Sequence, residues 1–274
     1  MPNGNILDRI VARKKHEVTA ARQRMSASQL EESDLFSREC YSLAEFIRDP
    51  LRTGIIAEFK RSSPSKGVIN NHSSVKDITK GYAAAGASAI SVLTDSDFFG
   101  GSYIDLIQAR KVNQLPILRK DFLVDEYQVL EAKAWGADVI LLIASILHPD
   151  EIKKIAGLAR TLGMSVLLEV HNERELERSL CEELDAVGVN NRNLADFSVS
   201  LENSYRLVAK IPDQFLKISE SGISDPRIIA ELRSAGFQGF LIGENFMKEQ
   251  DPVKAINDFV KVMGETSQPS QPSA

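Results

Sequence analysis

An eightfold alternation of two kinds of segment constrains the fold of this chain more than any other feature. Short apolar runs rich in β-branched residues predict strands, and segments with apolar residues at helical spacing lie between them. The eight predicted strands cover residues 54–60, 87–94, 115–122, 137–144, 164–170, 185–191, 214–221 and 238–244. Such strict alternation implies a parallel sheet, because parallel neighbours need a helical crossover. Eight units of this kind fit either a closed barrel or a doubly wound open sheet.

Polar residues at the carboxyl ends of the predicted strands favour the barrel. Glu58 and Lys60 share one face of the first strand with Ile56, because side chains two positions apart point the same way. Later strands end in further groups of this kind, namely Lys120, Glu169, Asn190 with Arg192, and Glu220. A structural ring of salt bridges could occupy the same positions, but burying so many charges without a function is costly. In a barrel, all these side chains would converge on one mouth.

The sequence therefore predicts an α/β fold, a (β/α)8 TIM barrel over residues 49–264, with a segment on either side. Residues 1–48 form a predicted N-terminal helical extension. Within it, 5–24 reads as an amphipathic helix, a polar stretch follows, and a second short helix lies near 42–49. Residues 265–274 are rich in Ser, Gln and Pro and are predicted to be disordered.

Charge and composition narrow the class of function. The formal net charge of −5 argues against sequence-independent nucleic-acid binding, which requires a basic surface. Two distant cysteines, Cys40 and Cys181, predict neither a disulfide framework nor a zinc site, and they suit a reducing cytoplasm. The N-terminal segment lacks the apolar core of a signal peptide, and no apolar run reaches the roughly 18 residues of a membrane helix. The histidines follow no metal-binding spacing and are expected at the surface or in loops; they are His16, His72, His148 and His171.

Two glycine-containing loops have the character of a phosphate site. Gly222 follows the seventh predicted strand in SESGI, and Gly243 follows the eighth in LIGEN. Barrels often bind phosphate at these two loops through backbone N–H groups, and the Ser63 hydroxyl could add a contact. The glycine-rich loop 94–103, TDSDFFGGSY, is either a plain turn before a helix or an apolar wall for a flat substrate.

Eight segments, spread over nearly the whole chain from ILDRIVARKKHEV to LIGENFMK, match one known family. They are IIAEFKRSSPSKG, SVLTDSDFFGGS, ILRKDFLVDEYQV, ADVILLI, LLEVHNERELE, VGVNNRNL, ISESGI and FLIGENFM. Together they resemble the indole-3-glycerol phosphate synthases of tryptophan biosynthesis. The resemblance implies a (β/α)8 barrel whose N-terminal segment helps to form the substrate site. It also implies a carboxy-lyase that converts 1-(2-carboxyphenylamino)-1-deoxyribulose 5-phosphate to indole-3-glycerol phosphate, carbon dioxide and water.

The resemblance also implies roles for matching residues. Lys120 corresponds to the general-acid lysine and Lys60 to the second active-site lysine, and the essential carboxylates are Glu58 and Glu169. The family's remaining polar positions correspond to Asn190, Arg192, Glu220 and Ser221. Its phosphate contacts correspond to Ser63, Gly222 and Gly243. The apolar wall around the anthranilate ring would comprise Phe98, Phe122, Leu141, Leu194 and Ile242.

Glu244 follows the last of these glycines, at a position where the family varies between Ser and Glu. Its backbone N–H is therefore expected to contact the phosphate. Its carboxylate is expected to turn away, because two anions repel each other at close range.

The implied chemistry needs an acid, a base and a grip on the reacting carboxylate. Ring closure requires a proton on the ketone oxygen, which a lysine can donate if burial and cationic neighbours lower its pKa. Lys60 and Arg192 are the candidate neighbours of Lys120, and the same two cations would hold the substrate carboxylate until it leaves. Glu169, or alternatively Glu58, would take the amine proton during dehydration. The sequence does not decide which lysine acts in that second step.

Three other functions remain open from the sequence. A phosphosugar isomerase on the same barrel would need a carboxylate with a Cys or Asp partner at strand ends, and neither cysteine ends a strand. A Schiff-base aldolase would use Lys120 or Lys217, and a binding barrel would hold a phosphorylated ligand without turnover. The expected partner is a small anionic substrate carrying a carboxylate and a phosphate, with no nucleic acid, membrane, metal or cofactor. The expected assembly is a monomer or a weak homodimer.

Overall fold

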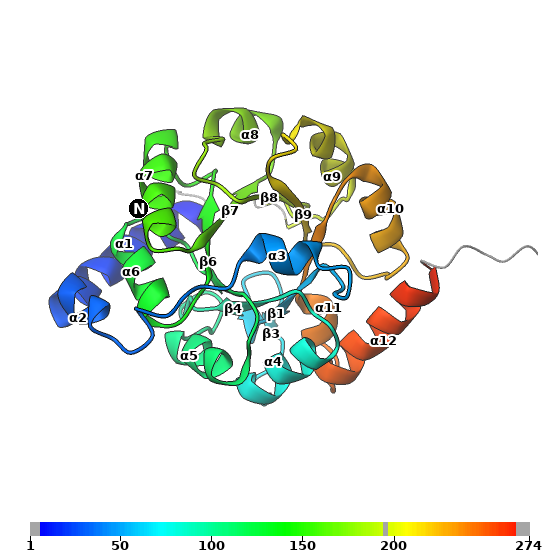
Figure 1. Cartoon of the computed structure of the whole chain (residues 1–274), viewed down its shortest axis with the longest axis horizontal. Coiled ribbons are helices and arrows are strands. Elements are labelled where there is room, and N and C mark those ends of the chain that lie inside the picture. Colours follow the sequence, from blue (N-terminus) through cyan, green and yellow to red (C-terminus); the bar gives the residue numbers. More distant parts are fainter. Residues whose placement is uncertain (1–5, 194–196, 267–274) are drawn as a thin grey trace, which may run out of the picture.

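Eight parallel strands close into a barrel at the centre of the molecule (Figure 1), in a computed structural model that describes residues 6–193 and 197–266. Each barrel strand pairs with the next in chain order, and the last pairs with the first. They are β1 (Ile55–Phe59), β4 (Ala89–Leu93), β5 (Ile117–Lys120), β6 (Val139–Ile143), β7 (Ser165–Val170), β8 (Ala186–Asn190), β9 (Leu216–Glu220) and β10 (Gly239–Ile242). Each lies within its predicted segment, so the predicted (β/α)8 barrel is confirmed. A hairpin of β2 (Ser62–Ser63) and β3 (Gly67–Val68) lies in the loop after β1.

Helices follow the barrel strands and cover the outside of the barrel (Figure 1). They are α4 (Val75–Ala84), α5 (Tyr103–Val112), α6 (Tyr127–Ala134), α7 (Pro149–Thr161), α8 (Glu173–Ser179), α9 (Glu202–Leu207), α10 (Ile228–Ala235), α11 (Glu244–Met247) and α12 (Pro252–Thr266). A 3-10 turn, η1 (Val208–Lys210), extends α9. Because α12 reaches Thr266, it continues into the segment predicted to be disordered from residue 265. The remainder of that segment, 267–274, lies outside the described residues.

Alternation along the strands divides the core into two layers. Outward-facing residues such as Ile90 and Phe240 pack in the layer between the strands and the helices. Inward-facing residues such as Leu118 and Ile218 pack against one another in the barrel interior. Both faces of each strand are therefore apolar over most of its length, as expected for a parallel sheet buried on both sides.

The strand register gathers the inward polar residues at one end of the barrel. Asn190 lies directly opposite Glu220, and Glu169 lies opposite Gly188, in neighbouring strands. Register partners in parallel strands face the same side of the sheet, so these side chains enter the interior together. Asn190 and Glu220 are the last residues of their strands, and Glu169 is the last but one of its strand. The polar end of the interior is therefore the carboxyl end of the strands, where barrel enzymes carry their active sites.

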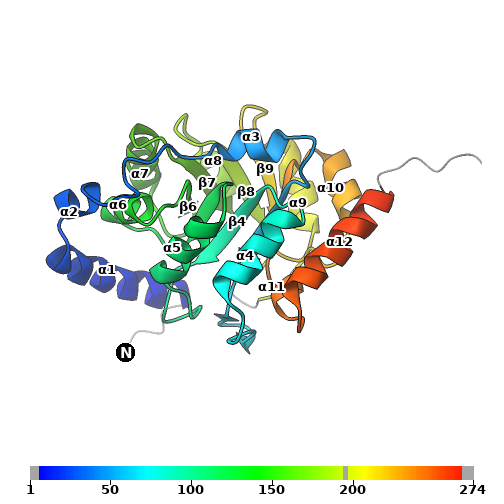
Figure 2. The ribbon, with the colours of Figure 1, turned by 60° about the horizontal axis from the view of Figure 1, so that its bottom comes forward.

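The N-terminal extension contributes one helix to each end of the barrel (Figure 2). α1 (Ile6–Arg24) lies on the side of the carboxyl ends of the strands, and α3 (Leu43–Arg48) lies across the opposite end. Leu43 and Ile47 of α3 pack into the interior cluster and close that end. Between them, α2 (Ala27–Glu31) forms in a stretch predicted only as polar. A capping box between Ser26 and Gln29 begins this short helix, and its Leu30 is buried.

Candidate active site

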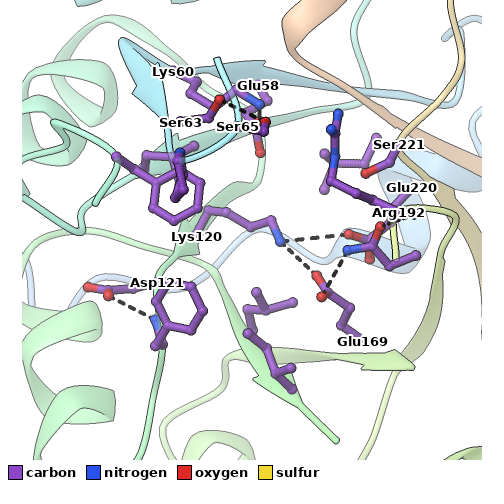
Figure 3. Close-up of a pocket in the computed structure, with 18 of the residues that line it drawn as sticks. Glu58, Lys60, Ser63, Ser65, Lys120, Asp121, Glu169, Arg192, Glu220 and Ser221 are labelled. Atoms are coloured by element: carbon purple, nitrogen blue, oxygen red, sulfur yellow. Dashed lines mark hydrogen bonds and ion pairs between the residues drawn. The ribbon is translucent and has the colours of Figure 1, made fainter. Parts of the chain in front are cut away.

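A cavity of about 140 Å³ opens at the carboxyl ends of the strands (Figure 3). All seven residues predicted to be catalytic line it, namely Glu58, Lys60, Lys120, Glu169, Asn190, Arg192 and Glu220. They come from β1, β5, β7, β8 and β9 and the residues just after those strands. The barrel closure therefore brings together side chains that are more than half the chain apart in sequence.

Lys120 lies between two buried carboxyl groups at the end of β5. Its Nζ is 2.8 Å from Glu169 Oε2 and 3.7 Å from Glu220 Oε2. Burial alone would lower the pKa of Lys120, but the carboxylates of Glu169, Glu220 and Glu58 outweigh burial and raise that pKa. The expectation of cationic neighbours that lower the pKa of Lys120 is therefore wrong for the free protein. The candidate neighbours, Lys60 and Arg192, each pair with a different carboxylate.

The two carboxyl groups beside Lys120 differ in their protonation. Burial raises the pKa of Glu220 to about 8, although the charge of Lys120 opposes this, and the nearby Glu169 raises the Glu220 pKa further. Burial acts in the same direction on Glu169, but the charges of Lys120 and His171 and a hydrogen bond from Asn190 Nδ2 (3.0 Å) hold its pKa low, at about 2. One ammonium thus stabilises one carboxylate, and the second carboxyl group stays neutral at pH 7.

Gly188 of β8 makes room for Glu220. A methyl group at Gly188 would overlap Glu220 Oε1 and lie 3.0 Å from Glu220 Cδ. Oε1 of Glu220 has no hydrogen-bond partner among the described residues, although it is buried. The carboxyl group is therefore held in place by packing and by its position beside Lys120. Sequence analysis did not give Gly188 a role.

Glu58 and Lys60 form a second ion pair at the end of β1. Lys60 Nζ is 3.0 Å from Glu58 Oε1, and Ser91 Oγ of β4 lies 3.4 Å from Glu58 Oε2. Gly243, predicted to contact phosphate, is also the residue against which Glu58 packs, because a methyl group there would lie 2.5 Å from Glu58 Oε1. The predicted pair of opposite charges on one face of the first strand is thus present.

Arg192 pairs with the residue that was expected to turn away. Its Nη2 donates to Glu244 Oε2 at 3.1 Å, and Glu244 lines the cavity. Lys66 Nζ lies 4.0 Å from the other carboxylate oxygen. In the free protein these two cations therefore hold the Glu244 carboxylate toward the mouth, and the expectation that it turns away from a bound phosphate stays a prediction.

An adjoining hollow of about 380 Å³ is lined by two of the three predicted phosphate contacts, Gly222 and Gly243, but not by Ser63. Ser221, Gly222 and Gly243 line it, along with the Arg192 and Glu244 side chains that it shares with the main cavity. Ser221 and Gly222 both have positive φ, 67° and 78°, so the chain turns sharply after β9. Ser63 lines the main cavity instead, with its hydroxyl 3.4 Å from that of Ser65.

The predicted apolar wall is only partly correct. Phe122 and Leu141 line the cavity, whereas Phe99 lines it in place of Phe98, with its ring 5.9 Å from that of Phe122. Ile242 faces the helix layer, so Leu241 is the residue of β10 that lines the main cavity. Both errors are shifts of one position. On β10 such a shift exchanges the two faces of the strand, whereas Phe98 and Phe99 lie in a turn, where alternation does not apply. Leu194 lies outside the described residues.

Helix α1 forms part of the cavity wall, as the family resemblance implied for the N-terminal segment, although sequence analysis named none of its residues. Ile6, Leu7 and Ile10 line the cavity. Lys14, one turn further along, is buried, and its Nζ lies 2.8 Å from Asp95 and 3.0 Å from Asp121 at the ends of β4 and β5. The amphipathic pattern predicted the helix, but a lone lysine on its apolar face gave no sign of where the helix docks.

The described part of the chain has neither a cluster of metal-binding side chains nor a membrane-spanning helix. In residues 6–193 and 197–266, no group of three or more His, Cys, Asp or Glu side chains is arranged to hold a metal ion. Across the same described residues, no helix has the length and apolar content needed to cross a membrane.

Comparison with known proteins identifies the family. The family model for indole-3-glycerol phosphate synthase matches residues 7–259. The chain belongs to this family. It is 45% identical over 259 residues to the indole-3-glycerol phosphate synthase of Bacteroides thetaiotaomicron, covering 94% of this chain and 99% of that protein. It is 44% identical to the Polaromonas sp. protein of the same name, covering 92% and 97% of the two chains.

Membership of the indole-3-glycerol phosphate synthase family does not favour the phosphosugar isomerase alternative. A solved structure described as native KDPGal shares 16% sequence identity with the chain, with a TM-score of 0.55. The match covers 77% of this chain and 93% of the other. At that level of identity the likeness supports the barrel fold alone.

Proposed function

We infer that the chain is a carboxy-lyase of tryptophan biosynthesis that converts 1-(2-carboxyphenylamino)-1-deoxyribulose 5-phosphate to indole-3-glycerol phosphate, carbon dioxide and water. The observation that carries this proposal is the position of the Lys120 ammonium, 2.8 Å from Glu169 and 3.7 Å from Glu220. An acid and a base held side by side in a mouth with apolar walls suit proton transfers to and from a bound ketose.

The two anionic ends of this substrate would replace carboxylates of the protein. The hollow lined by Ser221, Gly222 and Gly243 suits the phosphate, which would take over Arg192 as Glu244 releases it. No step needs an organic cofactor, because proton transfers and orientation account for every bond that changes.

The aromatic end would occupy the main cavity. Phe99, Phe122 and Leu141 offer it an apolar wall, and α1 covers it with Ile6 and Ile10. In this position the carboxylate of the substrate would come within reach of Lys60 and Arg192. Excluding water from this space would strengthen both ion pairs.

Ring closure would use Lys120 as the general acid. As the ring carbon attacks the ketone carbon, the carbonyl π electrons move to oxygen, and that oxygen takes a proton from the Lys120 ammonium. The bond to the carboxylate then breaks, its electrons return to the ring and carbon dioxide leaves. Glu169 and Glu220 favour the charged form of Lys120 before the reaction, so the proton is present when the substrate binds.

Dehydration would use Glu169 as the base. Glu169 takes the amine proton, the carbon–oxygen bond breaks, and the leaving hydroxyl group receives a proton and departs as water. A proton then moves from the methylene carbon beside the nitrogen to the nitrogen, which completes the indole ring. Because Glu169 Oε2 is 2.8 Å from Lys120 Nζ, it can return the proton to Lys120, which then protonates the leaving group. Glu58, 3.0 Å from Lys60, is the alternative base.

Indole fluorescence, measured as product forms, tests this proposal. We expect the wild type to turn over, and Lys120→Ala to lose about a thousandfold in kcat with KM within about tenfold, because the lysine acts in the transition state. Glu169→Gln should also lose most of its kcat. Near-normal turnover by Lys120→Ala would reject the assigned role.

Lys217→Ala is the matched lysine control. Lys217 lies on β9 and pairs with Asp213 at 2.9 Å, and it lines neither the main cavity nor the hollow beside it. Its loss should leave kcat unchanged, and borohydride should trap no adduct with a phosphosugar at either lysine. An adduct would instead support the Schiff-base aldolase.

The expected setting of the enzyme is the cytoplasm, as a monomer or weak homodimer. Cys40 and Cys181 are free thiols, which is compatible with a reducing compartment. Sedimentation velocity over a range of protein concentrations would distinguish a monomer from a dimer.

A further inference from the structure

His171 lies directly behind the base proposed for dehydration. It follows β7 two positions after Glu169, so both side chains point to the same side of the extended chain. Its Nε2 is 3.5 Å from Glu169 Oε1, the oxygen that does not face Lys120. The imidazole is 12% exposed, and Nε2 is buried without a hydrogen-bond partner among the described residues. This histidine was expected at the surface or in a loop. It does lie in the loop between β7 and α8, but its ring is largely covered and contacts the active site.

A carboxylate at the start of α8 fixes the orientation of the ring. Glu175 Oε2 accepts the backbone N–H of His171 at 2.8 Å and lies 3.3 Å from the ring Nδ1. Asn172 donates to the other oxygen of Glu175 at 2.8 Å. A carboxylate held in this way favours a proton on Nδ1, which leaves Nε2 to exchange a proton with Glu169.

A second cavity of about 530 Å³ lies on the other side of His171 and Glu175. Both residues line it, together with Asn190 and Arg192, which also line the active-site cavity. The walls of this second cavity are rich in polar side chains, so water can occupy it. His171 therefore stands between water and the buried oxygen of Glu169.

The proposed reaction consumes one proton in each turnover. Two protons go to oxygen, the first to the ketone oxygen during ring closure and the second to the leaving hydroxyl group. One proton is recovered from the amine, and the substrate carboxylate departs as neutral carbon dioxide. After one turnover the pair of Lys120 and Glu169 is therefore one proton short. Bulk water does not reach this pair freely, because the side chains are only 16% and 4% exposed even without substrate.

We propose that His171 delivers to Glu169, from the second cavity, the proton that each turnover consumes; this relay rests on the proposed function. The imidazolium Nε2–H bond breaks as Glu169 Oε1 takes the proton. The neutral carboxyl group of Glu169 then rotates about its Cγ–Cδ bond so that the protonated oxygen faces Lys120. Lys120 takes this proton and becomes an ammonium, and Glu169 becomes a carboxylate again. A hydronium ion in the second cavity then recharges the neutral imidazole and leaves water. His171 acts through Glu169, so it is a positioning and relay residue that does not touch the substrate.

The charges around the ring suit this role. Glu169 on β7 and Glu175 on α8 favour the imidazolium, while Lys120 on β5 and burial oppose it. Arg192, after β8, faces the same second cavity. The two carboxylates prevail, and the pKa of His171 is raised above its usual value. The ring therefore keeps its proton to a higher pH than a free imidazole does and becomes neutral as the pH rises further, so multiple-turnover kcat should fall on an alkaline limb set by His171.

Rapid-quench kinetics on His171→Gln tests the relay. The first turnover uses the proton already on Lys120, so its rate should stay within about twofold of the wild type. Later turnovers must wait for a proton, and their rate should fall about 10- to 100-fold, with KM little changed. The variant should also lose the alkaline limb assigned to His171. In His171→Ala, added imidazole should restore the later turnovers, whereas a slow product release would not respond to imidazole.

Ser145→Ala is the matched control, because Ser145 lines the same second cavity and has no titratable group. It should keep wild-type rates in both phases. If first and later turnovers of His171→Gln slow equally, or if imidazole has no effect on His171→Ala, His171 has a purely structural role and the relay is wrong. Wild-type rates of the first and later turnovers in both His171→Gln and His171→Ala would also overturn the relay. A wild type that does not turn over the substrate would reject the proposed function itself, and with it the relay.

Discussion

Replacing Lys14 by Met should detach helix α1 from the barrel mouth. The Lys14 ammonium is buried and touches three carboxylates, from Asp95 at 2.8 Å, Asp121 at 3.0 Å and Glu17 at 2.8 Å. Asp121 keeps Arg119 at 3.1 Å when the lysine is lost. Asp95 is fully buried, and its Oδ2 has no other ion pair or hydrogen bond in the described residues. The substitution thus leaves one buried charge without compensation.

The free-energy cost of breaking the Lys14 ion pairs can be compared with the free energy that holds α1 on the barrel. Removing one partner of a buried ion pair costs about 3–5 kcal/mol. The apolar anchors of α1 on the barrel, Ile10 and Val18, are buried, and each contributes about 1.5–3 kcal/mol. The penalty is thus about as large as the docking free energy of the helix. The helix should separate and let water reach Asp95, while the barrel remains folded.

Amide hydrogen exchange on α1 measures this separation. Protection of the α1 amides should fall by at least about a hundredfold in Lys14→Met, since each 1.4 kcal/mol is worth a factor of ten. Protection in the barrel strands should stay the same. Because Ile6 and Ile10 line the active-site cavity, kcat/KM should fall about 10- to 100-fold as well.

Arg13→Met provides the matched control. Arg13 pairs with Asp97 at 2.7 Å in the loop after β4, next to the loop residue that Lys14 contacts, but its side chain is 54% exposed. An exposed pair contributes about 0–1 kcal/mol, so exchange on α1 should hardly change. Adding Asp95→Asn to Lys14→Met removes the uncompensated charge and should restore much of the protection. If Lys14→Met exchanged as slowly as the wild type, the buried ion pair would not be what holds the helix.

Two further changes test the packing and charge of the mouth. Gly188→Ala should lower kcat at least about tenfold and the free energy of unfolding by about 1–3 kcal/mol, because its methyl group would overlap the Glu220 carboxyl group. Indole fluorescence measures kcat, and urea unfolding measures stability. An unchanged kcat would show that the position of Glu220 is not critical. Glu244→Gln should lower the dissociation constant for inorganic phosphate severalfold, because a carboxylate no longer competes with phosphate for Arg192. Titration calorimetry measures this constant. Weaker binding of phosphate would show that Glu244 and phosphate do not compete for Arg192.

Periodicity predicted most of the framework of this protein. Each barrel strand lies inside its predicted segment, and the polar residues placed by alternation, such as Glu58 and Glu169, all line one cavity. Alternation failed for Ile242, because β10 is apolar on both faces and so gives no sign of which face is inside. His171 carried a usable signal, since it stands two positions after Glu169, but its place beyond the strand suggested a loop.

Pairing between distant side chains was the part that the sequence could not supply. The residue types showed that cations and carboxylates meet at the mouth, but not which carboxylate each cation contacts. Lys120 could have had Lys60 or Arg192 beside it, and has Glu169 and Glu220 instead. Likewise, the pattern of residues 5–24 predicted a helix without indicating that Lys14 docks it over the barrel mouth. These contacts depend on distances of a few ångströms between separate strands, which periodicity does not specify.

Because the cations of the cavity are already paired with carboxylates of the protein, an anionic substrate must compete for them. The cations that line the cavity among the described residues are Lys60, Lys120 and Arg192, and each contacts a carboxylate of the protein, namely Glu58, Glu169 and Glu244. A substrate with a carboxylate and a phosphate must therefore displace carboxylates of the protein from these cations.

Glu220 keeps this exchange balanced. If it were ionised, the cavity would carry a net negative charge and would repel the substrate. Its raised pKa keeps it neutral, which leaves the three cations matched by Glu58, Glu169 and Glu244. Asp121 also lines the cavity, but its charge is matched by Lys14 and Arg119 behind the wall. The outermost of these pairs, between Arg192 and Glu244, is also the most exposed of the three. An incoming phosphate can therefore break this pair at the lowest cost in free energy. The inner pair of Lys120 and Glu169 must stay together to pass protons.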